Sequence, residues 1–122
     1  MKLNHTQLIV VAHAPLATAY LALIEHVLGQ VPAGVMAIDV AADEPLAQID
    51  AKIMEAIGAG AQDTLLLTDL PGATPHNRAA AVAEQLNMGA DTLMSGISAP
   101  FVLRAVNYRH LSKAVLVDKL RA

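Results

Sequence analysis

Short runs of hydrophobic residues recur along the chain, and stretches with helical periodicity separate them. Each run has the length of a β-strand and is nearly continuous, as is typical of strands that are covered on both faces of a sheet. The four runs are residues 7–12, 35–40, 64–68 and 92–97. The pattern therefore predicts four buried strands.

Apolar residues at helical spacing predict helices between these strands. The predicted inner face of the first helix is Leu16, Tyr20, Leu23, Ile24, Val27 and Leu28, with Gly29 as its end. The second helix is predicted over residues 44–57, with Leu46, Ile49, Ile53, Met54 and Ile57 facing inward. A third is expected over about residues 75–86 and a fourth over about 100–107, whereas residues 111–120 fit a helix or a strand equally well.

Alternating strands and helices indicate an α/β fold with a mainly parallel four-stranded sheet and helices on both of its faces. With 122 residues, the chain is expected to form a single domain over residues 1–122. The sequence ends at Ala122 without a capping residue, so a continuation of the natural chain stays open.

Composition excludes several classes of function. A net charge of −3 and three aromatic residues provide neither the basic surface nor the stacking platform of a nucleic-acid binder. The absence of cysteine excludes disulfides, thiol nucleophiles and cysteine-based zinc sites. The apolar runs are too short to cross a bilayer, and residues 1–5 lack the apolar stretch of a signal peptide. We therefore expect a cytoplasmic protein with no membrane insertion.

Candidate chemistry gathers where the strands end, which is where open α/β sheets bind ligands. His13 follows the first predicted strand, and Asp69 follows the third. A carboxylate on a neighbouring strand would accept the Nδ1–H of His13 and leave Nε2 free as a nucleophile. From its position alone, His13 could equally well be an unreactive residue at the end of the strand. Asp69 taken alone is more often a turn residue.

The loop after Asp69 contains residues suited to an anion. Thr74 precedes Pro75 and is predicted to cap the third helix. Gly72 would let the backbone approach a phosphoryl group, which the free amides at the start of that helix would face. Ser98 follows the fourth predicted strand and adds a second hydroxyl at the same edge.

The other histidines offer less. His5, His26 and His110 are predicted to be solvated surface residues, and His76 is expected to be exposed near the candidate site. No two histidines have the spacing of a metal-binding helix, so neither a metal nor a cofactor is expected.

Two segments together resemble the IIA domain of the mannose-type sugar phosphotransferase system. They are Ile9–His13 and the segment Leu67-Thr68-Asp69-Leu70-Pro71-Gly72-Ala73-Thr74-Pro75-His76-Asn77. The resemblance covers roughly residues 6–109 and includes the segment from Gly96 to Pro100. The most specific element of the resemblance is the segment from Asp69 to Asn77, which we call the aspartate loop.

The resemblance implies a phosphocarrier with the strand order 2-1-3-4. In this family the histidine after the first strand takes a phosphoryl group from HPr and passes it to a IIB domain during sugar uptake. His13 matches that histidine, Asp69 the carboxylate that orients it, and Thr74 a loop hydroxyl near the phosphoryl group. Family members are commonly homodimers, which is therefore expected here.

The chain also departs from the family pattern. Ser98-Ala99-Pro100 stands where the family has Asn-x-Pro, and a linked IIB domain and the longer tail are missing. Two alternatives stay open: a regulatory module switched by phosphorylation of His13, and a small-ligand-binding domain without the chemistry. The dihydroxyacetone-kinase phosphocarrier has the same histidine but a different aspartate loop, and so fits less well.

Overall fold

The structure, a computed structural model, describes residues 5–122. The expectation that a signal peptide is absent is based partly on residues 1–4, and these lie outside the described residues. No helix in the described part of the chain is long and apolar enough to cross a membrane.

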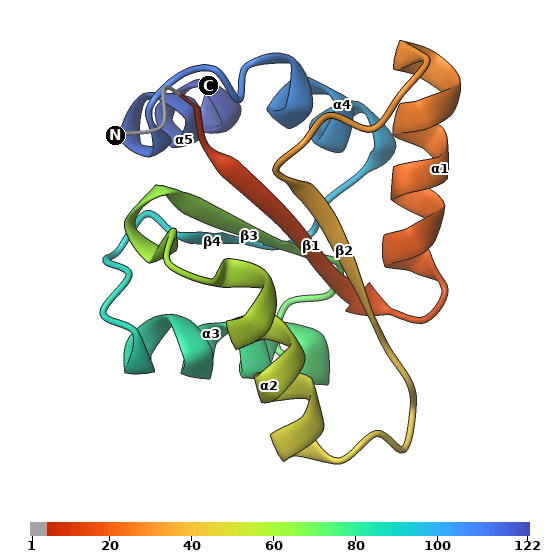
Figure 1. Cartoon of the computed structure of the whole chain (residues 1–122), viewed down its shortest axis with the longest axis vertical. Helices are drawn as coiled ribbons and strands as arrows, with labels where there is room; N and C mark the ends of the chain where they lie inside the picture. Colours follow the sequence, from red (N-terminus) through yellow and green to blue (C-terminus); the bar gives the residue numbers. More distant parts are fainter. Residues whose placement is uncertain (1–4) are drawn as a thin grey trace.

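Four parallel strands form one sheet in the order β2-β1-β3-β4, so the predicted fold class and strand order are confirmed (Figure 1). The strands are β1 (Gln7–His13), β2 (Val35–Val40), β3 (Thr64–Thr68) and β4 (Leu93–Met94). Val11 in β1 is in register with Thr68 in β3. This register brings the residues that follow the two strands to the same edge of the sheet.

Helices cover both faces of the sheet in three layers (Figure 1). One face carries α1 (Leu16–Leu28), α4 (Ala99–Asn107) and α5 (Lys113–Arg121), while the other carries α2 (Leu46–Ile57) and α3 (Thr74–Gln85). A short 3₁₀ turn, Ala61–Asp63, leads into β3. Alternate residues of β1 enter opposite layers: Leu8 and Val10 join the first, Ile9 and Val11 the second. Continuous apolar runs are therefore required by burial on both sides.

The fourth strand is much shorter than predicted. Only Leu93 and Met94 pair with β3, whereas the expected strand covered residues 92–97. The chain turns away at Gly96, which adopts a φ of 72° and donates its backbone N–H to the Asp69 carbonyl. Hydrophobic pattern alone could not show that this part of the run belongs to a loop.

The structure corrects one helix boundary and resolves the ambiguity of the tail. Helix α2 begins at Leu46 rather than at residue 44, because Pro45 disfavours helical geometry in the residue before it. The Glu44 side chain instead accepts a hydrogen bond from the Ala41 amide. The tail forms helix α5, which buries Leu116 and Leu120.

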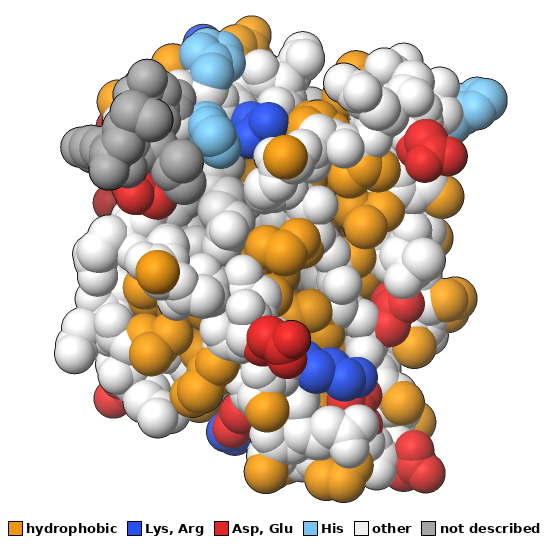
Figure 2. Space-filling model, viewed as in Figure 1, with side chains coloured by type: hydrophobic (Ala, Val, Ile, Leu, Met, Phe, Trp, Pro, Cys, Tyr) orange, Lys and Arg blue, Asp and Glu red, His pale blue; other side chains and the backbone are white. Residues whose placement is uncertain are grey.

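Part of the predicted core of the helices is exposed. Helix α1 turns Ala17 and Ile24 toward the sheet, whereas Leu16 at its first position and Val27 and Leu28 in its last turn are exposed. In α2 the buried residues are Ile49, Ile53 and Ile57, whereas Leu46 at the first position is exposed. Figure 2 shows hydrophobic side chains reaching the surface over α2 at the lower end of the view. Helical spacing identifies one side of a helix but not how far the sheet extends beneath it.

We expect Ile53→Ala to lower the free energy of unfolding by about 2–5 kcal/mol, because it opens a cavity beneath α2. Ile53 is fully buried, whereas the exposed Val27 provides a control, Val27→Ala, that should change stability by less than about 0.5 kcal/mol. Urea denaturation followed by circular dichroism measures both. A loss of similar size in the two variants would contradict the assignment of the core.

Candidate functional site

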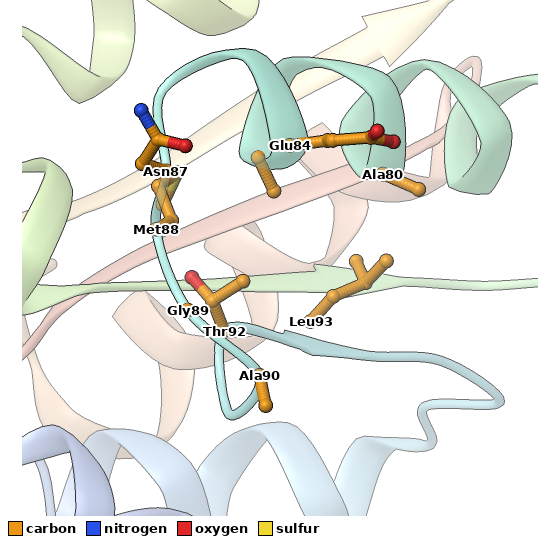
Figure 3. Close-up of a pocket in the computed structure, with 9 residues that line it drawn as sticks. Ala80, Glu84, Asn87, Met88, Gly89, Ala90, Thr92 and Leu93 are labelled. Atoms are coloured by element: carbon orange, nitrogen blue, oxygen red, sulfur yellow. The ribbon is translucent and has the colours of Figure 1, made fainter.

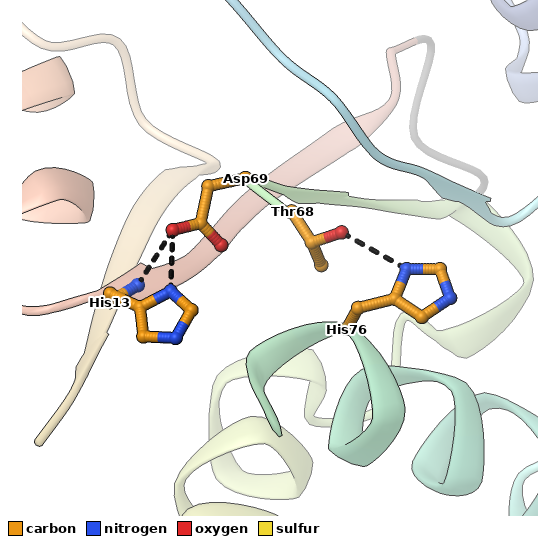
Figure 4. A network of polar contacts seen from close by, with 4 residues as sticks. All are labelled: His13, Thr68, Asp69 and His76. Carbon is orange, nitrogen blue, oxygen red and sulfur yellow. Dashed lines mark hydrogen bonds and ion pairs between the residues drawn. The ribbon is translucent and has the colours of Figure 1, made fainter. Parts of the chain in front are cut away.

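His13 and Asp69 meet at the edge of the sheet where β1 and β3 end (Figure 4). The Asp69 Oδ2 atom lies 2.8 Å from the His13 Nδ1 atom and 3.1 Å from the His13 backbone nitrogen. One carboxylate oxygen therefore holds both the ring and the backbone of His13. Sequence alone suggested this pairing, and the structure brings the two residues together.

The hydrogen bond determines which ring nitrogen of His13 is available. An ionised carboxylate can only accept, so Nδ1 carries a proton, and in the neutral ring Nε2 keeps its lone pair. The His13 side chain is 44% exposed, whereas the Asp69 side chain is only 8% exposed. The ring is thus open to a reaction partner while the carboxylate that orients it is shielded.

The pKa of Asp69 reflects two opposing effects. Burial favours the neutral carboxyl and by itself raises the pKa, but the hydrogen bonds from the His13 ring and backbone amide outweigh burial, so that the pKa lies below its ordinary value. The second oxygen, Oδ1, is buried and has no hydrogen-bond partner within residues 5–122. Asp69 is therefore ionised at neutral pH, with its negative charge directed at the imidazole.

Thr74 lines a pocket of about 280 Å³ together with His13. It does not cap α3, although the sequence had predicted that it would. The structure corrects that expectation: Ala73 occupies the cap position, and Thr74 is the first helical residue. No side chain makes a capping hydrogen bond to the first amides of α3. Thr74 is exposed, which leaves its hydroxyl accessible at the mouth of the pocket.

Asn77, for which the sequence predicted no role, holds the aspartate loop. Asn77, in the first turn of α3, donates its Nδ2–H to the Gly72 carbonyl at 2.9 Å. Gly72 is exposed and adopts a φ of 78°, a left-handed conformation that favours glycine. The position of Asn77 could have indicated this contact, because a side-chain amide in the first turn of a helix can reach back to the preceding loop. Asn77 therefore fixes the loop that follows Asp69.

Ser98 lies at the same edge but is engaged locally. Its hydroxyl oxygen caps α4 by accepting a hydrogen bond from the Phe101 amide at 3.3 Å. The preceding loop is tied to the end of β3, since the Ile97 amide donates to the Thr68 carbonyl. Among the hydrogen bonds of residues 5–122, none joins Ser98 to His13 or Asp69. The structure therefore brings His13, Asp69 and Thr74 together, with Ser98 beside them.

His76 is half-buried rather than exposed, contrary to expectation. Its Nδ1 atom lies 3.3 Å from the Thr68 hydroxyl, on a contact separate from that of His13 and Asp69 (Figure 4). The predicted exposure of His26 and His110 is confirmed, whereas His5 is half-buried. No group of three histidine, aspartate or glutamate side chains suited to a metal occurs in residues 5–122.

A larger hollow of about 400 Å³ lies beside α3 and β4 (Figure 3). Most of its lining residues are small or apolar, and Glu84 is its one ionisable side chain. It contains no nucleophile paired with a base. The His13 pocket is therefore the stronger candidate, because it alone joins an exposed imidazole to a buried carboxylate in the part of the chain that is described.

We expect the pKa of the Asp69 carboxyl to lie below that of an ordinary aspartate, although burial opposes this, because the His13 ring and backbone amide donate to it. His13→Ala removes the ring donor, whose hydrogen bond lowers the pKa of Asp69, so this pKa should rise. Since the folded pKa is depressed, ionised Asp69 stabilises the fold above its unfolded pKa, and this stabilisation is lost as the pH falls through the folded pKa. Carbon-detected NMR titration measures the value, and a pKa unchanged by His13→Ala would contradict the assigned contact.

Comparison with known proteins places this geometry in a family. The sorbose-specific EIIA component of a phosphotransferase system (PTS) from Lacticaseibacillus casei is 34% identical over 116 residues, which cover 93% of this chain and 82% of that protein. A phosphotransferase system component EIIA from Streptococcus agalactiae has a similar fold, with a TM-score of 0.85 at 24% identity over 95% of this chain and 89% of that one. A mannose/sorbose-specific IIA subunit from Enterococcus faecalis gives 0.81 at 24% identity, covering 96% and 87%.

Residues 7–119 match the family model EIIA-man, described as the PTS system fructose IIA component. This match spans all four strands and both residues of the His13–Asp69 pair. With the family model and the sorbose-specific relative in agreement, the chain belongs to the mannose-type IIA components of the sugar phosphotransferase system.

Proposed function

We propose that this chain is a phosphocarrier in which His13 accepts a phosphoryl group from phospho-HPr and passes it to a IIB protein. Membership of the IIA family supports a role in phosphoryl relay. The observation that carries the proposal is the double hydrogen bond from His13 to a single buried oxygen of Asp69. It leaves an oriented nucleophilic nitrogen, Nε2, on a ring that a partner can reach.

In the proposed transfer, the Nε2 lone pair attacks the phosphorus of the donor phosphohistidine in line. The new Nε2–P bond forms as the donor N–P bond breaks, and the donor imidazole leaves with the electron pair and takes up a proton. His13 is cationic at that moment, and the adjacent Asp69 carboxylate stabilises the charge until the Nδ1 proton is released. Such transfers depend mainly on position and electrostatics, which suits a site built from one fixed ring.

Thr74 and the start of α3 form the proposed cradle for the phosphoryl oxygens. The first amides of a helix have no intrahelical partner and attract anions, and α3 is a regular helix of 12 residues. The Thr74 hydroxyl lines the same pocket as His13. Gly72 keeps the loop free of a side chain, and Ser98 contributes its hydroxyl from the neighbouring loop.

We expect His13→Ala to abolish phosphorylation, because no other residue supplies the oriented nitrogen. Intact-mass spectrometry after incubation with phosphoenolpyruvate, enzyme I and HPr measures the gain of one acid-labile phosphoryl group. His26→Ala removes an exposed histidine on α1 and serves as the matched control, which should be labelled like the wild type. Labelling of His13→Ala at another residue would overturn the assignment.

The same experiment separates the alternatives. A labelled wild type that passes its phosphoryl group to a IIB protein supports the transport relay. A labelled protein that transfers to no IIB protein, but binds a regulator only in one phosphorylation state, would indicate the regulatory module. An unlabelled wild type in mixtures that phosphorylate a control IIA protein would favour the ligand-binding domain.

We expect Asp69→Asn to slow phosphorylation by about tenfold or more while the fold is retained, because an amide can pair with the wrong tautomer of His13. Rapid-quench measurement of transfer from phospho-HPr gives the rate, and circular dichroism monitors the fold. A rate equal to that of the wild type would show that Asp69 is only a turn residue.

A further inference from the structure

A second pocket, of about 330 Å³, lies at the beginning of β1, opposite to the end that holds His13. His5 precedes the strand and lines this pocket, whereas His13 is the last residue of the strand. Figure 2 shows histidine and basic side chains together over the start of β1, which Figure 1 locates. The other lining residues are Val106, Asn107, Arg109 and His110. At about 3.3 Å per residue, β1 puts roughly 20 Å between this pocket and the His13 pocket.

Arg109 brings a positive charge to the pocket for which the described chain supplies no counterion. Its Nη1 atom is buried and has no hydrogen-bond partner within residues 5–122. No acidic side chain lines the pocket, and no ion pair formed within residues 5–122 involves Arg109. A buried guanidinium N–H without an acceptor is unfavourable, and native proteins usually satisfy such a group. The pocket therefore offers a charged donor to an acceptor from outside the chain.

The donors of His5 and Arg109 converge beside Gly34. A Cβ atom placed on Gly34 would lie 3.6 Å from Arg109 Nη1 and 3.7 Å from His5 Nε2. Both nitrogens therefore face the same small space, and glycine places no side chain in it. Gly34 has a φ of 86°, which favours glycine at this position. An imidazole can donate an N–H whether it is neutral or protonated, so His5 and His110 can join Arg109 as donors.

More positive charge lies next to the pocket. The Tyr108 ring is a neighbour of the His110 ring, with 6.3 Å between their centroids. Lys119 and Arg104 both lie over the Tyr108 ring, 4.5 and 5.7 Å from its centroid. Residues 104–122 contain five lysine and arginine residues and a single acid, although the whole chain has a net charge of −3. This uneven distribution of charge would attract an anion toward the pocket.

We propose that this pocket binds a phosphate group, as inorganic phosphate or as a small phosphate monoester, through Arg109, His5 and His110. We call these three residues the Arg109 site. A phosphate presents several oxygens to a guanidinium and two imidazoles, whereas a monocarboxylate has two oxygens and one charge. The volume suits a small molecule. The inference does not rest on the proposed function, because the Arg109 site and the His13 pocket share no lining residue.

Titration of the ¹⁵N-labelled protein with inorganic phosphate at neutral pH and constant ionic strength tests the Arg109 site. We expect saturable changes in the ¹H–¹⁵N correlation peaks of Gly34 and Arg109, because their amides lie beside the proposed phosphate. Glycerol 2-phosphate should shift the same peaks if the site takes monoesters, whereas acetate should shift them little. The same titration of His13→Ala should give an unchanged Kd, which separates this site from phosphate bound near His13.

We expect Arg109→Gln to raise the Kd for inorganic phosphate by about tenfold or more, because the charge and its donors are lost. Arg109→Lys should recover only part of the affinity, since an ammonium lacks the planar fork of a guanidinium. Arg121→Gln is the matched control for charge: Arg121 is exposed and pairs with Asp91, so this variant should bind phosphate like the wild type. Circular dichroism and the urea midpoint verify folding. If Arg109→Gln does not fold, His5→Ala provides the test, with a rise in Kd of about threefold or more.

Several outcomes would overturn the Arg109 site. Peak changes confined to residues near His13, or an equal Kd in Arg109→Gln and the wild type, would place the phosphate elsewhere. Equal responses to phosphate, acetate and chloride would indicate an adventitious ion only. A change of oligomeric state in Arg109→Gln would assign the pocket to a contact between copies of the chain. A response to inorganic phosphate but not to glycerol 2-phosphate would support the site and restrict it to the free anion. None of these outcomes bears on the phosphocarrier function, which phosphorylation of His13 tests separately.

Discussion

The contact of one Asp69 oxygen with both the ring and the backbone amide of His13 is the interaction on which the site depends. Both hydrogen bonds favour the ionised carboxylate and hold the pKa of Asp69 below its ordinary value, although burial opposes this. The fixed charge selects the Nδ1–H tautomer and thereby leaves Nε2 free. In the proposed transfer the same charge lies beside the imidazole as the ring becomes positive, so one interaction would serve both orientation and charge stabilisation.

The parallel sheet provides the conditions for that contact. Strands β1 and β3 are neighbours although 50 residues separate the end of β1 from the start of β3, and their connections leave in opposite directions at the switch point. Burial of β1 on both faces fixes the position of His13, and the hydrogen bonds from Gly96 and Asn77 hold the two sides of the aspartate loop. Rigid strands thus place the reactive pair, and loops are left to meet the partner.

Much of this arrangement is predictable from the sequence, because strands covered on both faces leave continuous apolar runs. The strands β1 to β3, the helices between them and the position of His13 beside Asp69 follow from that pattern and from the family resemblance. The short β4 does not, since the turn at Gly96 depends on a hydrogen bond to the Asp69 carbonyl. The prediction that Thr74 caps α3 was wrong, because Thr74 is already the first residue of the helix. Leu16 and Leu46 were predicted to be buried but are exposed, because periodicity does not reveal where the sheet ends.

The role proposed for His13 is tested most directly by ¹⁵N NMR of the uniformly ¹⁵N-labelled protein after phosphorylation by phospho-HPr. We expect a one-bond ¹⁵N–³¹P coupling at Nε2 of His13. A coupling at Nδ1, or a phosphoryl group on any other residue, would contradict it.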